Sequence, residues 1–219
     1  MRAAPLVKCC GFKDAEGLSQ LNALGVDFVG FILAPSKRNV NPADLPGLFQ
    51  AVPAGMKKVG VFVNPSLSEL ADVMKIAAFD LIQLHGQESP DFCRQLKQEF
   101  SVDIIKAVHI GDGQGQVPPD EYGKWIDYLL LDTLDPQAAG GTGKTFRWDV
   151  IPMFEQWCKV HGVKLLVAGG ITPENALQLI SEWPLAGIDV ASGIETDGRK
   201  DRLKIEKLVE RVKGNGRST

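Results

Sequence analysis

Two glycine-containing pairs, Gly169-Gly170 and Ser192-Gly193, each follow a short apolar run of this 219-residue chain. Glycine lets the backbone approach an anion closely, and serine offers a hydroxyl group as well as an N–H group. Such groups bind phosphate, although each pair could also serve only as a tight turn between a strand and a helix. Because both pairs occupy equivalent places, the sequence favours a phosphate site.

Four other residues that could do chemistry end or follow apolar runs: Cys10, Arg38, His85 and Asp132. Each has a structural alternative, since thiols fill cores, aspartates cap turns, arginines are often solvated, and histidines often only donate or accept hydrogen bonds. Lys8 lies two residues before Cys10, so on a strand the two side chains share a face. The charge of the lysine would favour the thiolate that a base requires.

The elements that must position these residues are short runs of β-branched, aliphatic and aromatic residues. Most of the runs are continuously apolar, as strands buried on both faces are. We predict eight strands: Leu6–Cys10, Asp27–Leu33, Lys57–Val63, Phe79–Leu84, Val102–Val108, Tyr128–Asp132, Lys164–Ala168 and Gly187–Ala191. On the first of them, Cys9 and Cys10 point to opposite sides, and we expect Cys9 to fill the core.

Segments between these runs carry helix signals. Apolar residues recur at helical spacing from Leu67 to Ala78 and again from Ile205 to Val212. Ser66 with Glu69 fits a capping box. Ser89-Pro90 and Thr172-Pro173 each fit an N-cap followed by proline at the first helical position.

Eight strands alternating with helices favour a parallel α/β fold closed into a (β/α)8 TIM barrel. An open doubly wound sheet is the alternative, but it usually has fewer strands and a glycine-rich fingerprint after the first strand, where this chain has only Gly11. We expect residues 1–219 to form one domain with a disordered tail at 214–219. In a barrel, chemistry belongs at the carboxyl ends of the strands, where the residues above are expected.

The composition excludes several classes of protein. Hydrophobic residues make up 44% and charged residues 23% of the chain, and 24 basic against 27 acidic residues give a net charge of −3. These values argue against intrinsic disorder, nucleic-acid binding and a polybasic membrane anchor. No apolar run approaches the roughly 20 residues of a membrane span, and no secretory signal precedes the first strand. Four cysteines are too few for a disulfide scaffold, so we expect a cytoplasmic protein with reduced thiols.

One segment resembles a nucleotide-binding loop. Residues Ala138–Thr145 almost match G-x-x-x-x-G-K-[ST], but the first position is alanine and a long loop separates the segment from the sixth run. A phosphate-cradling loop turns directly from strand to helix. The three glycines in this segment indicate a mobile active-site loop instead, in which Lys144 could be only a solvated charge.

The motifs occur together in one order along the chain. They are Val7–Gly11, Ser36–Val40, Val59–Asn64, Gln83–Gly86, Leu130–Thr133, Gly140–Phe146, Ala168–Gly170 and Asp189–Glu195. This series closely resembles the phosphoribosylanthranilate isomerase family of tryptophan biosynthesis, from Val7 to about Ile205. Each motif alone is weak evidence for this resemblance, whereas eight motifs in the same order are specific evidence for it.

The resemblance implies an Amadori rearrangement of N-(5-phosphoribosyl)anthranilate, an aminoaldose, to 1-(2-carboxyphenylamino)-1-deoxyribulose 5-phosphate, without metal or organic cofactor. It assigns the general base to Cys10, the general acid to Asp132 and binding of the anthranilate carboxylate to Arg38. His85 would lie beside the substrate, and Gly169, Gly170, Ser192 and Gly193 would bind its phosphate. The expected partner is this small phosphoribosyl substrate, bound by a monomer or homodimer, with no nucleic-acid or membrane partner.

Three positions depart from the family pattern: Cys9 replaces a common Ile, Arg147 a frequent Asp, and Ala191 a frequent Ser. Arg147 leaves the anchoring of the glycine-rich loop open, and Ala191 removes one hydroxyl group near the phosphate.

Two other functions also stay open. Another phosphosugar isomerase or epimerase would need a different acid–base pair, and a metal-dependent one would need clustered His and Asp ligands. A non-catalytic phospho-ligand-binding barrel would not need Cys10 or Asp132. A side activity on the related aminoaldose of the histidine pathway is also open.

Overall fold

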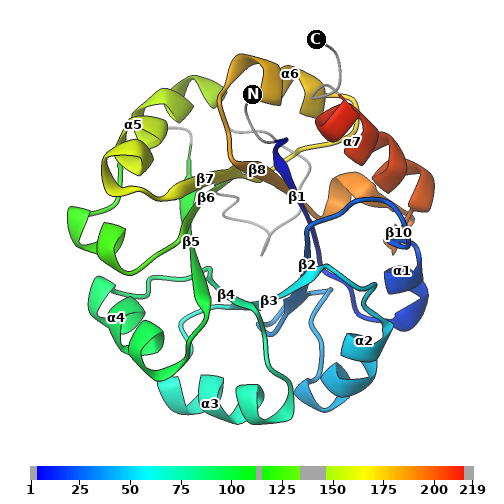
Figure 1. Ribbon diagram of the computed structural model, residues 1–219, viewed down its shortest axis with the longest axis horizontal. Helices are drawn as coiled ribbons and strands as arrows, with labels where there is room; N and C mark the ends of the chain where they lie inside the picture. The colour runs from blue at the N-terminus through cyan, green and yellow to red at the C-terminus, as the bar shows by residue number, and fades with distance from the viewer. Residues whose placement is uncertain (1–3, 112–114, 134–146, 215–219) are drawn as a thin grey trace.

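The structure, a computed structural model, describes residues 4–111, 115–133 and 147–214. Eight parallel strands pair in chain order into a closed barrel, which confirms the predicted fold. They form an inner ring with the helices outside it (Figure 1). The strands are β1 Leu6–Cys10, β2 Phe28–Ile32, β3 Lys57–Phe62, β4 Leu81–Leu84, β5 Asp103–Ile110, β6 Tyr128–Thr133, β7 Lys164–Val167 and β8 Gly187–Val190.

All eight predicted strands are present, with ends that differ by up to two residues from the prediction. The outer helices are α1 Ala15–Ser19, α2 Leu45–Ala51, α3 Leu67–Ile76, α4 Pro90–Glu99, α5 Ile151–His161, α6 Ala176–Glu182 and α7 Arg202–Gly214. Short 3-10 helices are η1 Pro42–Asp44, η2 Asp120–Lys124, η3 Trp148–Val150 and η4 Ser192–Ile194. Within the described residues, η2 is the helical element that links β5 to β6. A hairpin of β9 Glu195–Thr196 and β10 Arg199–Lys200 precedes α7.

The predicted helix starts are confirmed with one exception. Ser66 and Glu69 form both bonds of a capping box at the start of α3, and Ser89 caps α4 with Pro90 in its first turn. The prediction at Thr172-Pro173 was wrong, because α6 begins only at Ala176. The Asn175 side chain accepts a hydrogen bond from the Thr172 N–H and donates one to the Gly170 carbonyl. These bonds hold the residues before α6 in a turn.

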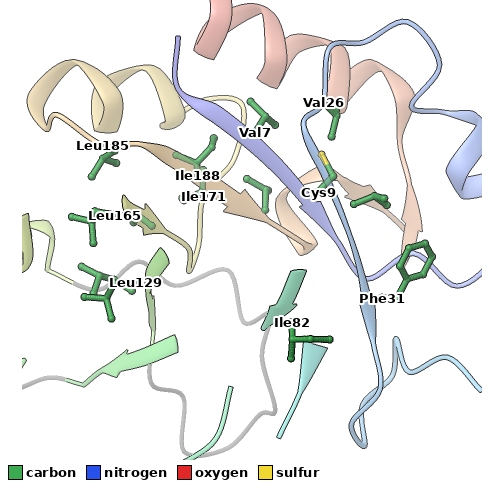
Figure 2. Packing of buried hydrophobic residues seen from close by; sticks show 14 of the residues in the cluster. Val7, Cys9, Val26, Phe31, Ile82, Leu129, Leu165, Ile171, Leu185 and Ile188 are labelled. Carbon is green, nitrogen blue, oxygen red and sulfur yellow. The ribbon is translucent and has the colours of Figure 1, made fainter. Parts of the chain in front are cut away.

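Two apolar layers hold the barrel together. The outer layer joins outward strand residues to the buried faces of the helices, and Figure 2 shows Val7, Cys9 and Ile188 within it. The inner layer fills the lower part of the barrel with side chains that include Phe28, Leu81 and Tyr128. Cys9 is fully buried in the outer layer, as expected for the residue that points away from the barrel interior.

The C-terminal helix confirms its predicted apolar stripe, because Ile205, Leu208, Val209 and Val212 are all buried. Gly214, predicted to belong to the tail, is the last residue of α7. Residues 215–219 of the predicted tail and the predicted glycine-rich loop at 138–145 lie outside the described residues. Beyond that loop, the exposed Arg147 pairs with Asp149 two positions later.

Candidate active site

Cys10 is the last residue of β1 and lies on the inward face of the barrel, with its side chain 6% exposed. Lys8 lies below it on the same face and forms a buried ion pair with Asp189 of β8, with 2.7 Å between Nζ and Oδ2. Burial raises the pKa of the Cys10 thiol, and the nearby charge of Lys8 is the largest opposing influence. The charge of Lys8 favours the thiolate, as expected, but burial of the thiol has the larger effect on its pKa.

The pairing of Lys8 with Asp189 explains why its charge is retained so deep in the barrel. Burial alone would lower the pKa of Lys8, but Asp189 and Cys10 outweigh that effect and the pKa stays above its ordinary value. Lys8 is thus a fixed cation under the thiol. The remaining oxygen of Asp189, Oδ1, is buried and has no hydrogen-bond partner among the described residues.

Asp132 lies at the mouth end of β6, opposite His109 in the β5–β6 ladder. One carboxylate oxygen accepts a hydrogen bond from the Thr133 N–H at 2.8 Å, and the other lies 3.4 Å from His85 Nε2. Asp132 remains partly exposed, so a ligand in the barrel mouth can reach it. The structure therefore brings together the predicted residues Asp132 and His85.

His85 is oriented by Gln83, which lies two residues earlier on the same inward face. The Gln83 amide Nε2 lies 3.1 Å from His85 Nδ1. When Nδ1 accepts from that amide, the proton of a neutral His85 lies on Nε2, facing Asp132. The His109 ring packs edge-on against His85 with 4.7 Å between ring centroids, and burial, followed by the charge of His85, lowers the pKa of His109.

Arg38 lies on the loop between β2 and α2 and is already engaged by a carboxylate of the protein. Its Nε and Nη2 donate to the two oxygens of Glu195 at 2.8 and 2.7 Å. Burial raises the pKa of Glu195, but the hydrogen bond from Arg38 and the charge of Lys200 outweigh it, so the pKa is lowered overall. One edge of the Arg38 guanidinium group is therefore occupied by Glu195, and the Nη1 side remains for a ligand.

The turns after β7 and β8 pack directly on their neighbours. Gly169 and Gly170 have φ of 81° and 63°, a conformation that favours glycine. A Cβ at Gly169 would lie 2.1 Å from Thr133 Oγ1, and one at Gly193 would lie 1.9 Å from the Ile171 carbonyl oxygen. Packing therefore requires glycine at 169 and 193, and the two turns with Ser192 form one rim of the mouth.

Sequence reasoning missed the side chains that support this site from a distance. Glu195 and Lys200 belong to the hairpin after β8, and no pattern in the sequence linked that hairpin to Arg38. Among the described residues, no cluster of three or more His, Cys, Asp or Glu side chains could hold a metal ion. The same part of the chain has no helix whose length and apolar character would let it cross a membrane.

Comparison with known proteins gives the site its context. A family model described as N-(5'-phosphoribosyl)anthranilate (PRA) isomerase matches residues 7–211. The chain belongs to the PRA isomerase family. The curated PRA isomerase of Brevibacillus brevis is 43% identical over 95% of this chain and 94% of the relative. That of Crocosphaera subtropica is 40% identical over 94% of this chain and 98% of the relative.

Solved structures of PRA isomerases share the fold along the whole length. The crystal structure from Thermotoga maritima superimposes with a TM-score of 0.80 at 31% identity, covering 96% of this chain and 99% of that chain. A PRA isomerase in complex with reduced 1-(o-carboxyphenylamino)-1-deoxyribulose 5-phosphate matches with a TM-score of 0.78 at 28% identity and the same coverage. The Thermotoga maritima enzyme is also described as dimeric, in a crystal structure of monomers generated from it.

Proposed function

We propose that the chain converts N-(5'-phosphoribosyl)anthranilate to 1-(2-carboxyphenylamino)-1-deoxyribulose 5-phosphate, in tryptophan biosynthesis, by acid–base catalysis. The observation that carries the proposal is the placement of Cys10 and Asp132 at the mouth ends of β1 and β6, two strands that are not neighbours in the ring. A substrate between them can meet a thiol and a carboxylate on different sides. Membership of the PRA isomerase family supports the choice of substrate.

The first chemical step opens the sugar ring. Asp132 gives a proton to the ring oxygen while the C1–O bond breaks, and the amine lone pair forms a C=N bond to C1. Cys10 as thiolate then removes the proton from C2, and the C–H electrons form a C1=C2 bond as the C=N electrons return to nitrogen. Proton transfer from the C2 hydroxyl to C1 completes the ketone. The redox change is internal to the substrate, and each proton transfer contributes a rate factor of about 10²–10⁴.

Other residues at the mouth would hold the substrate. The turns of Gly169-Gly170 and Ser192-Gly193 offer N–H and hydroxyl groups to the phosphate. Arg38 would receive the anthranilate carboxylate on its Nη1 side, because Glu195 occupies its Nε edge. His85, beside the substrate, would donate from Nε2 to Asp132 after Asp132 has lost its proton.

Two buried oxygens suggest where the sugar hydroxyl groups bind. Gln83 Oε1 and Asp189 Oδ1 both belong to inward-facing residues, and neither has a hydrogen-bond partner among the described residues. Buried acceptors without a donor are costly, and a sugar hydroxyl group reaching down from the mouth would satisfy each of them.

We expect the enzyme to work in the cytoplasm as a monomer or homodimer. The four cysteines are all free and buried, as suits a reducing compartment. A dimeric relative supports the second of the two oligomeric states.

A direct assay tests the proposal. Purified protein is mixed with freshly generated phosphoribosylanthranilate in buffer with a chelator, and anthranilate-type fluorescence is followed. A rapid, protein-dependent loss of fluorescence that Cys10→Ala and Asp132→Asn abolish is the expected result. No loss of fluorescence, combined with binding of the reduced product analogue, would instead support a phospho-ligand-binding barrel.

A further inference from the structure

The hairpin after β8 buries two opposite charges at the edge of the barrel mouth. Glu195 and Lys200 pair directly across the β9–β10 ladder, and their side chains are only 9% and 5% exposed. Buried charges are costly unless they are paired and hydrogen-bonded. The partners of Glu195 and Lys200 therefore indicate which groups the hairpin positions.

Lys200 joins the ends of the first and last strands of the barrel. The β1–β8 ladder ends at Cys9 and Val190. Beyond that point, Lys200 Nζ donates to the Cys10 carbonyl at 2.7 Å and to the Ala191 carbonyl at 3.1 Å, and its third contact is Glu195 Oε1 at 2.7 Å. All three donors of the ammonium group are used. Glu195 is thereby fixed relative to the peptide that carries Cys10.

Glu195 in turn fixes Arg38. Its two oxygens accept from Nε and Nη2 in the bidentate geometry that specifies the plane of a guanidinium group. The aliphatic part of Arg38 lies against Gly11, where a Cβ would come within 2.5 Å of Arg38 Cδ. Contacts on both sides leave Arg38 little freedom, and its remaining donors have a set direction.

We infer that Glu195, anchored by Lys200, is a positioning residue that aims Arg38 at the carboxylate of the aryl amine and so sets the selectivity for an anthranilate over a plain aniline. The inference rests on the proposed function of this site. Arg38 and Lys200 carry two positive charges against the single negative charge of Glu195, so the cluster keeps a net positive charge for a second carboxylate.

The charge count separates positioning from a simple electrostatic role. Glu195→Gln removes a negative charge, so a role as counter-charge alone predicts tighter binding of the carboxylated substrate. Positioning predicts the opposite, because Arg38 loses the partner that holds its plane. A merely structural role predicts equal losses on every substrate.

The experiment compares two substrates: phosphoribosylanthranilate and phosphoribosylaniline, which lacks the carboxylate. For Glu195→Gln we expect KM for phosphoribosylanthranilate to rise about tenfold, with kcat changed by less than about threefold. The reason is that the variant loses the bidentate contact that orients Arg38. The kcat/KM for phosphoribosylaniline should stay within about twofold of wild type. Asp197→Asn, which removes an exposed negative charge from the same hairpin, is the matched control and should leave both substrates unchanged.

A double-mutant cycle keeps the inference testable if Glu195→Gln also lowers stability. In an Arg38→Met background, Glu195→Gln should have no further effect on KM, because Glu195 acts through Arg38. An unchanged or lower KM for phosphoribosylanthranilate, equal losses on both substrates, or an undiminished effect in the Arg38→Met background would each overturn the inference. A wild-type chain that does not turn over phosphoribosylanthranilate would overturn the proposed function as well, which distinguishes the two failures.

Discussion

The thiol of Cys10 occupies space that Gly30 leaves empty on the neighbouring strand. The two residues are paired in the β1–β2 ladder, and a Cβ at Gly30 would lie 2.6 Å from Cys10 Sγ and 3.2 Å from Cys10 Cα. Gly30 therefore decides where the thiol can lie. The position of the candidate base is set from β2 as well as from its own strand.

Gly30→Ala should displace the thiol and lower kcat by about 10²-fold, since a misplacement of about 1 Å at a reacting group has a cost of that order. Steady-state kinetics and circular dichroism of the purified variant measure the effect and the fold. Gly47→Ala is the control, because nothing lies within 4 Å of a Cβ there. Wild-type kcat in Gly30→Ala would show that the thiol position is not critical.

The two proton-transfer residues should be separable from binding. Cys10→Ala and Asp132→Asn should each lower kcat by about 10²–10⁴-fold, with KM less affected, because each removes a proton transfer but little of the substrate contact. Fluorescence-based progress curves over a range of substrate concentrations give both constants. A near-wild-type kcat in either variant would remove that residue from its role.

The pH dependence of the free enzyme should reflect the buried thiol. Burial raises the pKa of Cys10, so in the free enzyme the thiol should still be mostly protonated at the ordinary thiol value of about 8.5 and should ionise only above it. Ultraviolet thiolate absorbance, taken as the difference between wild type and Cys10→Ser, gives the titration directly. A half-titration below the ordinary thiol value contradicts the dominance of burial.

His109 should make the fold less stable in mild acid. Its pKa is lowered by burial and by His85, so below about pH 6.5 the unfolded chain binds a proton at this residue more readily than the folded chain. The stability that neutral His109 contributes is present above the unfolded pKa and is lost as the pH falls through the folded pKa. Urea unfolding at about pH 7.5 and about pH 5 should show a smaller decrease in unfolding free energy for His109→Gln than for wild type. Equal decreases in the two proteins count against this account.

The strands could be predicted because their signal is local. A run that is apolar on both faces identifies a buried strand, whatever lies beside it. The ends depend on partners far along the chain. β5 continues past the predicted Val108 to Ile110 because His109 and Ile110 pair with β6 residues. β4 starts at Leu81 rather than at Phe79, which packs instead against the rings of Phe49 and Phe62.

For the site as well, residues with a local sequence signal could be predicted, whereas contacts between distant parts of the chain could not. The motifs identified Cys10, Arg38, His85 and Asp132, and the structure places Asp132 beside His85. The contact between Arg38 and Glu195 spans 157 residues, and neither spacing nor residue type signals it. The net effect of burial on Cys10 likewise depends on how deeply the folded barrel covers the thiol.

The ion pair beneath the thiol also has a consequence for synthesis of the chain on the ribosome. Lys8 and Asp189 are 181 positions apart, so the lysine is made near the start of translation and its partner near the end. Until β8 emerges, β1 can pair only with β2, and Lys8 has no counter-charge from Asp189. The candidate site is therefore completed only when the last strand closes the barrel, and a nascent chain that stops short of Asp189 carries Cys10 without an enclosed site.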